Sequence, residues 1–573
     1  MPRRLTATLR GWFPRPFAGL TKRNLLREAG AGVTLLAIAV PLNIGYAQIV
    51  GLPPTVGLYA LVLPLIVWAL TVSSRQLVAS PDAAAAALVA TSIGGLAIAG
   101  TADYLSLVLA QTVLCGALFL VAAVFRLGFL ADFLSKPILV GLLAGLALDI
   151  LVGQVAKMLG ISVPPGGEFF EKLLALVTGL GAANVWSAMI AAGCLVVLLL
   201  GRRLAPAVPW ALVVLVLATL ATTLGGLEAR GVATLGPVEG GLPELHWPVV
   251  AWTDWAAVLP SAIALFLVGA GEGLLVSRAY ADKRGYRVDA NRDLFAFGLA
   301  NVASGATGSF AMGSSTARTA ALDQAGSRTQ FPAVIAAVGA TLLLVFGTGL
   351  LEHVPGPAIG AVLAVAVLPL LGIGDFAELW RRDRAEFAIA GVCFGVTVVF
   401  GSIVGIGIAF VLALVNLARR AASPDIDVLS LDEYGASSAE GLPLGRTTAP
   451  GIVVVRLAAP LFFANGTVFQ DTVQRTVEAA EPPVRHVVFD MEAVSDVDIT
   501  GAEAFARLRS WLLEHDIDVS YSRMRHETRE RMQHLGLLHG EAVHHSNREA
   551  LAALGARPNP RPNPGPNPGD PNP

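Results

Sequence analysis

Long apolar runs, separated by short polar breaks, recur along the first 420 residues. Most approach the roughly 20 residues that a helix needs to cross a bilayer. The clearest occupy 29–50, 105–125, 187–200, 211–224 and 331–351. This pattern predicts a polytopic α-helical membrane protein.

One stretch, 262–329, departs from simple apolar runs. Its first run contains Glu272, the only acid between Asp254 and Asp282. Ionisable residues within membrane spans are costly and usually face a cavity where they act. The stretch ends in SFAMGSSTARTAAL, which is too short to span a bilayer and rich in Gly, Ser and Thr. It predicts an interrupted helix whose N-terminus can hold an anion.

A second interrupted helix is predicted in the first half of the chain. A polar stretch leads to Pro81 and a run of alanines. Pro81 suits the first turn of a helix, and Asp82 favours the positive end of its dipole. Short interrupted helices at corresponding positions in two halves indicate a transporter's binding site.

Polar residues also mark other apolar runs. Pro41 is expected to break the first span, with Asn43, Tyr46 and Gln48 following it. The alternative is an ordinary proline kink whose polar residues bond neighbouring helices. Further on, Lys157 can extend its ammonium along the span, and Asp149 is interpreted as a helix–helix hydrogen-bonding group. The GxxxG pair of Gly141 and Gly145 indicates close helix packing.

The chain divides into five predicted segments. Residues 1–28 form a basic N-terminal segment, and 29–420 form the membrane region, with halves at about 29–226 and 255–420. Residues 421–449 are a linker. Strand and helix patterns alternate over 450–556 and predict an α/β domain. The tail, 557–573, is Pro/Asn/Gly-rich and is expected to be disordered.

Composition and charge narrow the function. The chain is 54% hydrophobic and 14% charged, with a formal net charge of −2, which argues against a nucleic-acid partner. The three cysteines lie far apart in apolar runs and are interpreted as core residues. Seven of the nine histidines follow residue 480, so no metal site is expected, and no other cofactor is indicated. The basic N-terminal segment lacks a cleavable signal and predicts cytoplasmic termini for a multi-pass plasma (inner) membrane protein.

Four motifs resemble the SulP-type sulfate permease family, which includes prestin and pendrin. They are PLNIGYAQIVGLPPTVGLYA, SSRQLVASPDAAAAALVA, the stretch from SRAYADKRGYRVDANRDL to STARTAALDQAGSRT, and a C-terminal region similar to a STAS domain. The resemblance implies fourteen membrane segments in two inverted repeats of seven, forming core and gate domains. It also implies a homodimer in which the core moves as an elevator.

The resemblance places the substrate between the facing N-termini of the third and tenth segments. The corresponding residues are Ser80, Pro81, Asp82 and Ala83 in one half-helix and Ser314, Ser315, Thr316 and Arg318 in the other. Tyr46 and Glu272 complete this site. Helix N-termini offer partial positive charge and free N–H donors, and Arg318 can add a fixed charge. The alternative for Arg318 is pairing with a neighbouring carboxylate.

Glu272 suggests coupling to protons. Sodium coordination looks incomplete, because the next helical turn offers Val276 in place of a hydroxyl. A carboxylate alone in an apolar span binds a proton readily, and protonated Glu272 no longer repels an anion. The alternative is a structural acid paired with Arg278.

In the STAS-like region, DVDITGAEAF resembles the loop that carries a phosphorylated Ser or Thr in anti-sigma-factor antagonists. Thr500 occupies that place. The alternative is that Thr500 is only the N-cap of a helix.

The sequence therefore predicts a secondary active transporter, not an enzyme, that moves a small anion together with protons. Sulfate, bicarbonate and dicarboxylates such as fumarate are the candidate substrates. An uncoupled anion channel or exchanger remains an alternative. Another is an anion sensor that signals through the STAS domain to a cytoplasmic partner.

Overall fold

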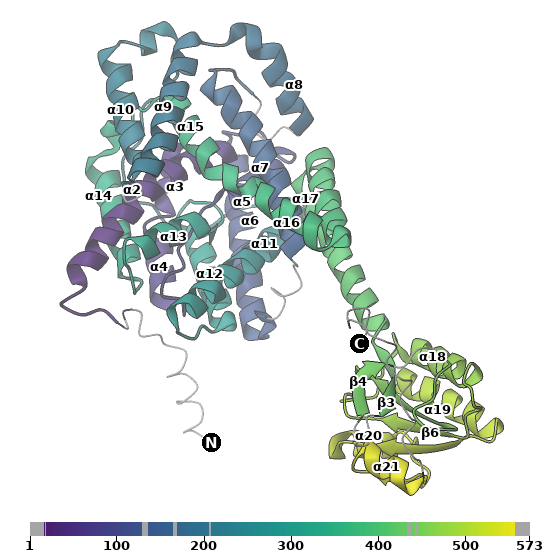
Figure 1. Cartoon of the computed structure of the whole chain (residues 1–573). Coiled ribbons are helices and arrows are strands. Elements are labelled where there is room, and N and C mark those ends of the chain that lie inside the picture. The colour runs from purple at the N-terminus through teal and green to yellow at the C-terminus, as the bar shows by residue number, and fades with distance from the viewer. Residues whose placement is uncertain are drawn as a thin grey trace, which may run out of the picture. The chain divides into compact units, whose positions relative to one another are not determined.

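The computed structural model describes residues 17, 19–128, 136–163, 169–205, 208–431, 437–441 and 445–555. The chain forms two compact units, Met1–Ala413 and Leu414–Pro573, and Figure 1 labels most of the helices and some of the strands. Most of the predicted basic segment 1–28 and the predicted tail 557–573 lie outside the described residues.

The membrane region is helical, and its described residues form fourteen apolar or half-length segments, the last of which extends beyond Ala413. The first seven are α2 (Leu25–Val50), α3 with α4 (Pro54–Tyr59 and Leu63–Thr71), α5 (Ala83–Gly94), α6 (Ala102–Val124), α7 (Lys136–Met158), α9 (Val185–Leu204) and α10 (Trp210–Leu224). The second seven are α11 (Trp252–Arg284), α12 (Ala290–Ala306), α13 (Thr316–Gln324), α14 (Phe331–Phe346), α15 (Gly356–Val367) and the two halves of α17 (Arg384–Ala422), which bends at Gly401. Two short helices, α8 (Phe169–Gly179) and α16 (Ile373–Arg382), connect segments.

Length and composition support a membrane location for this unit. Eight helices in the described part of the chain are long and apolar enough to cross a bilayer. Large apolar side chains are exposed on α9, α10 and α14, with Leu199 at 50%, Leu217 at 52% and Val338 at 52%. Such surfaces are unfavourable in water but match a hydrocarbon environment.

The helices pack in two groups, each drawn from both sets of seven. In one group, α12 packs against α4 and α6, α11 against α6, and α14 against α2. In the other, α15 packs against α7 and α9, and α9 against α10, as can be followed in Figure 1. A Cβ at Gly141 would collide with the Ala390 carbonyl of α17, so the close packing predicted for Gly141 is confirmed.

The predicted break at Pro41 is wrong. Helix α2 runs without interruption from Leu25 to Val50 with Pro41 inside it. Proline removes one helical hydrogen bond, but neighbouring helices can compensate for this within a membrane protein. Asn43, two residues later, bonds a neighbouring segment by donating from Nδ2 to the Gly57 carbonyl at 3.0 Å.

The second unit contains a six-stranded sheet of order β4-β3-β5-β6-β7-β8. Strands β5 (Ile452–Leu457), β6 (His486–Asp490), β7 (Asp518–Ser522) and β8 (Val543–His544) are parallel, whereas β3 (Ile426–Leu431) pairs antiparallel with β5. The same unit contains four helices, α18 (Gly466–Glu478), α19 (Ile499–Glu514), α20 (His526–His534) and α21 (Asn547–Ala553). Its core contains Phe469, Phe489 and Phe505.

Two strands lie within the segment predicted as a linker, 421–449. They are β3 and β4 (Ser437–Gly441), which pair with each other at the edge of the sheet. The polar sequence SSAEG gives no strand pattern by itself, so this prediction missed their contribution to the sheet.

Candidate functional site

Two very short strands join the two halves of the membrane unit. Strand β1 (Ala79–Ser80) precedes α5, and β2 (Gly313–Ser314) precedes α13. They pair antiparallel, with Ala79 opposite Ser314 and Ser80 opposite Gly313. The pairing holds the N-termini of α5 and α13 side by side, and we call this place the half-helix junction.

Side chains cap both half-helices at this junction. Asp82 is the N-cap of α5, and its Oδ1 accepts from the Ala85 N–H at 2.7 Å. Ser315 is the N-cap of α13 and accepts from the Arg318 N–H at 3.3 Å. A side chain on Gly313 would collide with the Asp82 carboxylate. Glycine at 313 therefore lets the two starts approach each other.

Arg318 is fully buried at the junction, with 1% of its side chain exposed. Its Nη1 donates to Asn43 Oδ1 at 2.8 Å, and its Nη2 donates to the Pro81 carbonyl. The guanidinium also lies 5.9 Å from the centre of the Tyr46 ring. Arg318 therefore connects α13 to the start of α5 and to α2.

Three buried polar atoms at the junction have no hydrogen-bond partner among the described residues. They are Ser80 Oγ, Ser314 Oγ and Arg318 Nε. Buried polar groups in native proteins are nearly always paired with protein, water or ligand. All three can donate a hydrogen bond, so the junction offers donors to an anion.

Glu272 brings a second carboxylate to the junction from α11. Helix α11, which carries Glu272, packs against α5 and β2, and Glu272 interacts electrostatically with Asp82 and Thr316. With both acids ionised, Asp82 (−1), Glu272 (−1) and Arg318 (+1) sum to −1. Protonation of one acid makes this set neutral.

The structure thus brings together the residues singled out in the membrane region. The first half-helix contributes Ser80, Pro81, Asp82 and Ala83, the second contributes Ser314, Ser315, Thr316 and Arg318, and Tyr46 and Glu272 come from α2 and α11. No individual role was predicted for Asn43, whose amide oxygen accepts from Arg318. The only sequence signal for Asn43 was its position two residues after Pro41.

Thr500 lies in the other unit, and the interpretation of it as an N-cap is wrong. The N-cap of α19 is Asp498, whose Oδ1 accepts from the Gly501 N–H at 2.6 Å. Asp498 Oδ2 also accepts from the Phe463 N–H at 3.0 Å. Aspartate is as good a cap as threonine or better, and Thr500 is left exposed in the first turn.

Two buried acids that the sequence did not reveal hold the ends of the half-helix segments. Glu28, with 0% exposure, accepts from Ser327 Oγ, the Arg328 N–H and Thr329 Oγ1 at 2.7–3.0 Å. Asp293, also at 0%, accepts from Ser277 Oγ at 2.6 Å. It accepts from Ser73 Oγ at 2.7 Å as well. These bonds fix the chain after α13 and before β1.

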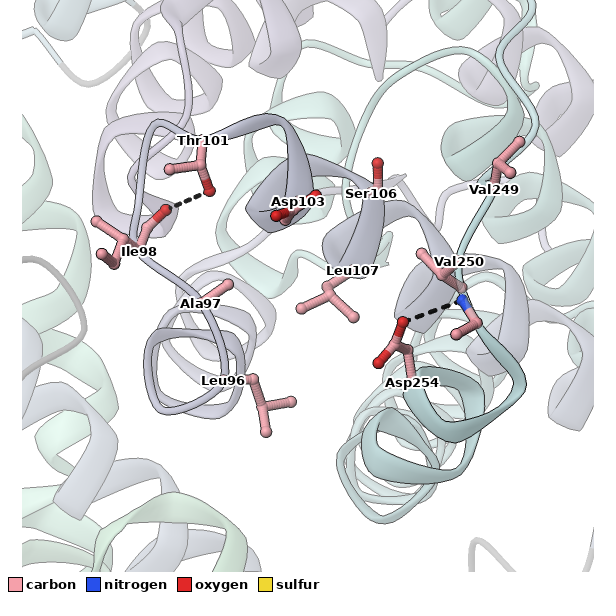
Figure 2. Close-up of a pocket in the computed structure, with 11 residues that line it drawn as sticks. Leu96, Ala97, Ile98, Thr101, Asp103, Ser106, Leu107, Val249, Val250 and Asp254 are labelled. Atoms are coloured by element: carbon pink, nitrogen blue, oxygen red, sulfur yellow. Dashed lines mark hydrogen bonds between the residues drawn. The ribbon is translucent and has the colours of Figure 1, made fainter.

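A separate pocket of about 510 Å³ lies at the other end of α5, and Figure 2 shows it. Its carboxylates come from Asp103 and Asp254, and Asp254 accepts from the Ala251 N–H at 3.0 Å. None of its lining residues is basic. Two acids without a cation disfavour an anion, so the half-helix junction remains the candidate site.

Candidate metal ligands and cysteines can also be located in the described part of the chain. Within the described ranges, no group of three or more His, Cys, Asp or Glu side chains could hold a metal ion. Cys115, Cys194 and Cys393 are free and buried, which confirms their interpretation as core residues.

Paired half-helices that meet within a helical membrane unit define a transporter-type fold. Comparison with known proteins identifies the family. The sulfate permease family matches residues 25–393, and the STAS domain family matches residues 446–550. The chain belongs to the sulfate permease family and carries a STAS domain.

Named relatives agree with this family assignment. A probable sulfate transporter of Mycobacterium tuberculosis (strain CDC 1551 / Oshkosh) is 34% identical over 93% of this chain and 96% of its own length. Low affinity sulfate transporter 3 of Stylosanthes hamata is 30% identical over 86% of this chain and 81% of its own.

Among solved structures, the murine solute carrier 26 family member A9 anion transporter in the inward-facing state is similar with a TM-score of 0.85. It shares 20% identity over 96% of this chain and 95% of that chain. The transmembrane domain of the cyanobacterium bicarbonate transporter BicA is similar with a TM-score of 0.58, at 20% identity over 69% of this chain and 98% of that one.

These findings confirm the fold class predicted from the sequence, with two repeats of seven membrane segments in core and gate domains and a C-terminal α/β STAS domain. The protein is a multi-pass membrane anion transporter and not an enzyme.

Proposed function

We propose that this protein is a proton-coupled symporter of small anions that binds its substrate at the half-helix junction. The observation that carries the proposal is the set of three unpartnered buried donors, Ser80 Oγ, Ser314 Oγ and Arg318 Nε. They lie where two helix N-termini, one from each repeat, meet. The aligned peptide dipoles and the guanidinium both favour negative charge there.

Sulfate is the first substrate to test, because the relatives cited above are sulfate transporters by name. Bicarbonate and dicarboxylates such as fumarate suit the same donors. Hydroxyl and guanidinium donors bind any small oxyanion or carboxylate. The junction therefore indicates the class of substrate, a small anion, but does not select one anion within that class.

Coupling to protons follows from the charges at the junction. An anion that enters while Asp82 and Glu272 are both ionised meets a net charge of −1. A proton on Glu272 removes that repulsion, so the anion and the proton favour each other's binding. Val276 supplies no oxygen ligand one turn after Glu272, which favours a proton over sodium.

The packing around the junction is compatible with transport by an elevator mechanism. Helix α5 packs against α2 and α11, and helix α13 packs against α2. The core can therefore carry the junction as one body against the gate. We further propose that the protein is a homodimer in the plasma (inner) membrane with both termini in the cytoplasm, in keeping with the basic residues before the first span.

The test is uptake into proteoliposomes of labelled sulfate, bicarbonate, fumarate and chloride, with and without an inward proton gradient. We expect the gradient to stimulate uptake of at least one anion, and Glu272→Gln to abolish that stimulation. Asp103→Asn, which removes a carboxylate of the separate pocket shown in Figure 2, is the matched control and should behave as wild type. Uptake that ignores the gradient would instead support an exchanger or channel.

A second role, in signalling, has one observation in its favour. Thr500 is exposed in the first turn of α19, and Ile499 beside it is 67% exposed. A hydroxyl next to an exposed apolar side chain suits modification or contact by a cytoplasmic partner. Phosphate incorporation that is lost in Thr500→Val would support this role.

A further inference from the structure

A second cavity, of about 320 Å³, lies between α2, α5 and α7. Its wall from α7 includes Asp149, Gly153 and Lys157, which are spaced at four-residue intervals and so share one helix face. Gln48 and Ile49 of α2 and Ala87 and Ala90 of α5 form facing walls. No residue assigned above to the half-helix junction lines it.

The position of this cavity relates it to the junction. Ala83 begins α5 at the junction, and Ala87 and Ala90 follow it on one face, about 6 and 10 Å further along the helix axis. On α2, the cavity reaches Gln48 near the end at Val50, away from the basic N-terminal segment. It therefore lies between the junction and the membrane face opposite that segment.

The charges lining the cavity favour an anion. Lys172 Nζ pairs with Asp149 Oδ2 at 2.7 Å, and these side chains are 12% and 14% exposed. Lys157 is half-buried and donates to the uncharged Gln48 Oε1. With Lys157 (+1), Lys172 (+1) and Asp149 (−1), the lining sums to +1. No carboxylate among the described residues pairs with Lys157.

The cavity also has room for a ligand beside the ammonium. A Cβ built at Gly153, one helical turn before Lys157, would meet no atom within 4 Å. A water molecule takes about 30 Å³ in the liquid, so the volume accommodates an oxyanion together with several waters. The Lys157 stem packs against α15, with its Cε 3.6 Å from a Cβ built at Gly356.

We propose that this cavity is a second anion-binding site, in which the Lys157 ammonium and the Gln48 and Gln154 amides hold a small oxyanion or carboxylate. The anion replaces Gln48 as the partner of Lys157, since an ammonium bonds an anion more strongly than a neutral amide. Gln154 Oε1 is buried without a partner, so its amide can turn to present its donors. Capture here precedes transfer to the junction, and that part of the inference rests on the proposed function.

A purely structural role for Lys157 makes a different prediction. Lysine in the last turn of a helix stabilises the free carbonyls and the negative dipole end. In that case its replacement lowers the stability of the protein, and the apparent affinity for the external anion stays the same.

Uptake of labelled sulfate into proteoliposomes separates the two roles. For Lys157→Gln and Gly153→Met, which remove the charge and fill the space, we expect the KM for external sulfate to rise about tenfold or more with kcat changed less than about twofold. Asp149→Asn should lower KM, because it leaves Lys172 without its counter-charge. The double variant Asp149→Asn with Lys172→Gln keeps the net charge and should match wild type. An unchanged KM in both Lys157→Gln and Gly153→Met would overturn the proposal.

A chemical rescue and a protection assay complete the test. Aminoethyl methanethiosulfonate restores an ammonium to Lys157→Cys and should restore KM, whereas the sulfonatoethyl reagent should not. External sulfate should slow the labelling of Ser162→Cys, which places a thiol in the cavity lining and keeps Lys157, even when Arg318→Gln has disabled the junction. If wild type takes up no sulfate, the proposed function fails for sulfate, and protection alone then decides whether the cavity binds it. Labelling that sulfate leaves unchanged would contradict the site.

Discussion

Arg318 Nη1 donates to Asn43 Oδ1 at 2.8 Å, so a half-helix of the second repeat is anchored to the first span of the first repeat. Its Nη2 bonds the Pro81 carbonyl, one residue before the cap of α5. One buried guanidinium therefore connects both half-helix starts, and its Nε has no hydrogen-bond partner among the described residues.

Replacement of Arg318 by lysine tests this geometry. Lysine keeps the charge but lacks the planar fork, so Asn43 or Pro81 loses its donor. We expect kcat/KM for the transported anion to fall roughly 10- to 100-fold, as for loss of one charge-assisted hydrogen bond of about 1.5–3 kcal/mol. Arg384→Lys, a change at the start of α17, is the control. Wild-type transport by Arg318→Lys would show that charge alone matters.

Asp82 has two roles that substitution can separate. Asparagine caps helices as well as aspartate but carries no charge. Asp82→Asn should therefore fold normally and bind the anion with a lower KM at neutral pH, because one repulsive charge is gone. Asp82→Ala removes the cap as well and should cost about 1 kcal/mol of stability. A higher KM in Asp82→Asn would contradict the repulsion argument.

Gly313 permits the close approach of β2 to Asp82. Gly313→Ala places a methyl group against that carboxylate, so we expect loss of transport together with a lower melting temperature in detergent. Gly391→Ala in α17 is the matched control, since a Cβ there meets nothing within 4 Å. Alanine in that helix should be neutral or stabilise by about 0.5–1 kcal/mol. Equal effects of the two variants would refute the assignment.

In the STAS domain, stability at the start of α19 should depend on Asp498 and not on Thr500. Asp498 accepts two backbone N–H groups, whereas Thr500 is exposed. Asp498→Ala should speed hydrogen exchange in the first turn of α19, in line with a cost of about 1 kcal/mol. Thr500→Ala should leave exchange there unchanged. The reverse result would restore Thr500 as the cap.

The sequence predicted the half-helix starts because their signals are local. Pro81 and the cluster of Gly, Ser and Thr around Ser314 interrupt apolar runs, and such interruptions are readable without a structure. The strand–helix alternation of the STAS region is local in the same sense, and β5, β6 and β7 lie where it predicts them.

Features that depend on partners distant in the chain were not predictable. The pairing of Ala79 with Ser314 joins two dipeptides that carry no strand signal of their own. Glu28 reads as an ordinary first-turn acid, and only its three donors from 327–329 show that it is buried. Pro41 misled the prediction because α2 continues through it, and Asn43 two residues later bonds the Gly57 carbonyl of the next segment.

The most direct test of the central claim is a structure determined with selenate, a sulfate analogue whose anomalous scattering locates it. We expect an anomalous peak at the half-helix junction, within hydrogen-bonding distance of Ser80 Oγ, Ser314 Oγ and Arg318 Nε, which is lost in a Ser80→Ala, Ser314→Ala double variant. A selenate peak elsewhere in the membrane unit with none at the junction would contradict the assignment. So would a junction peak that the double variant leaves unchanged.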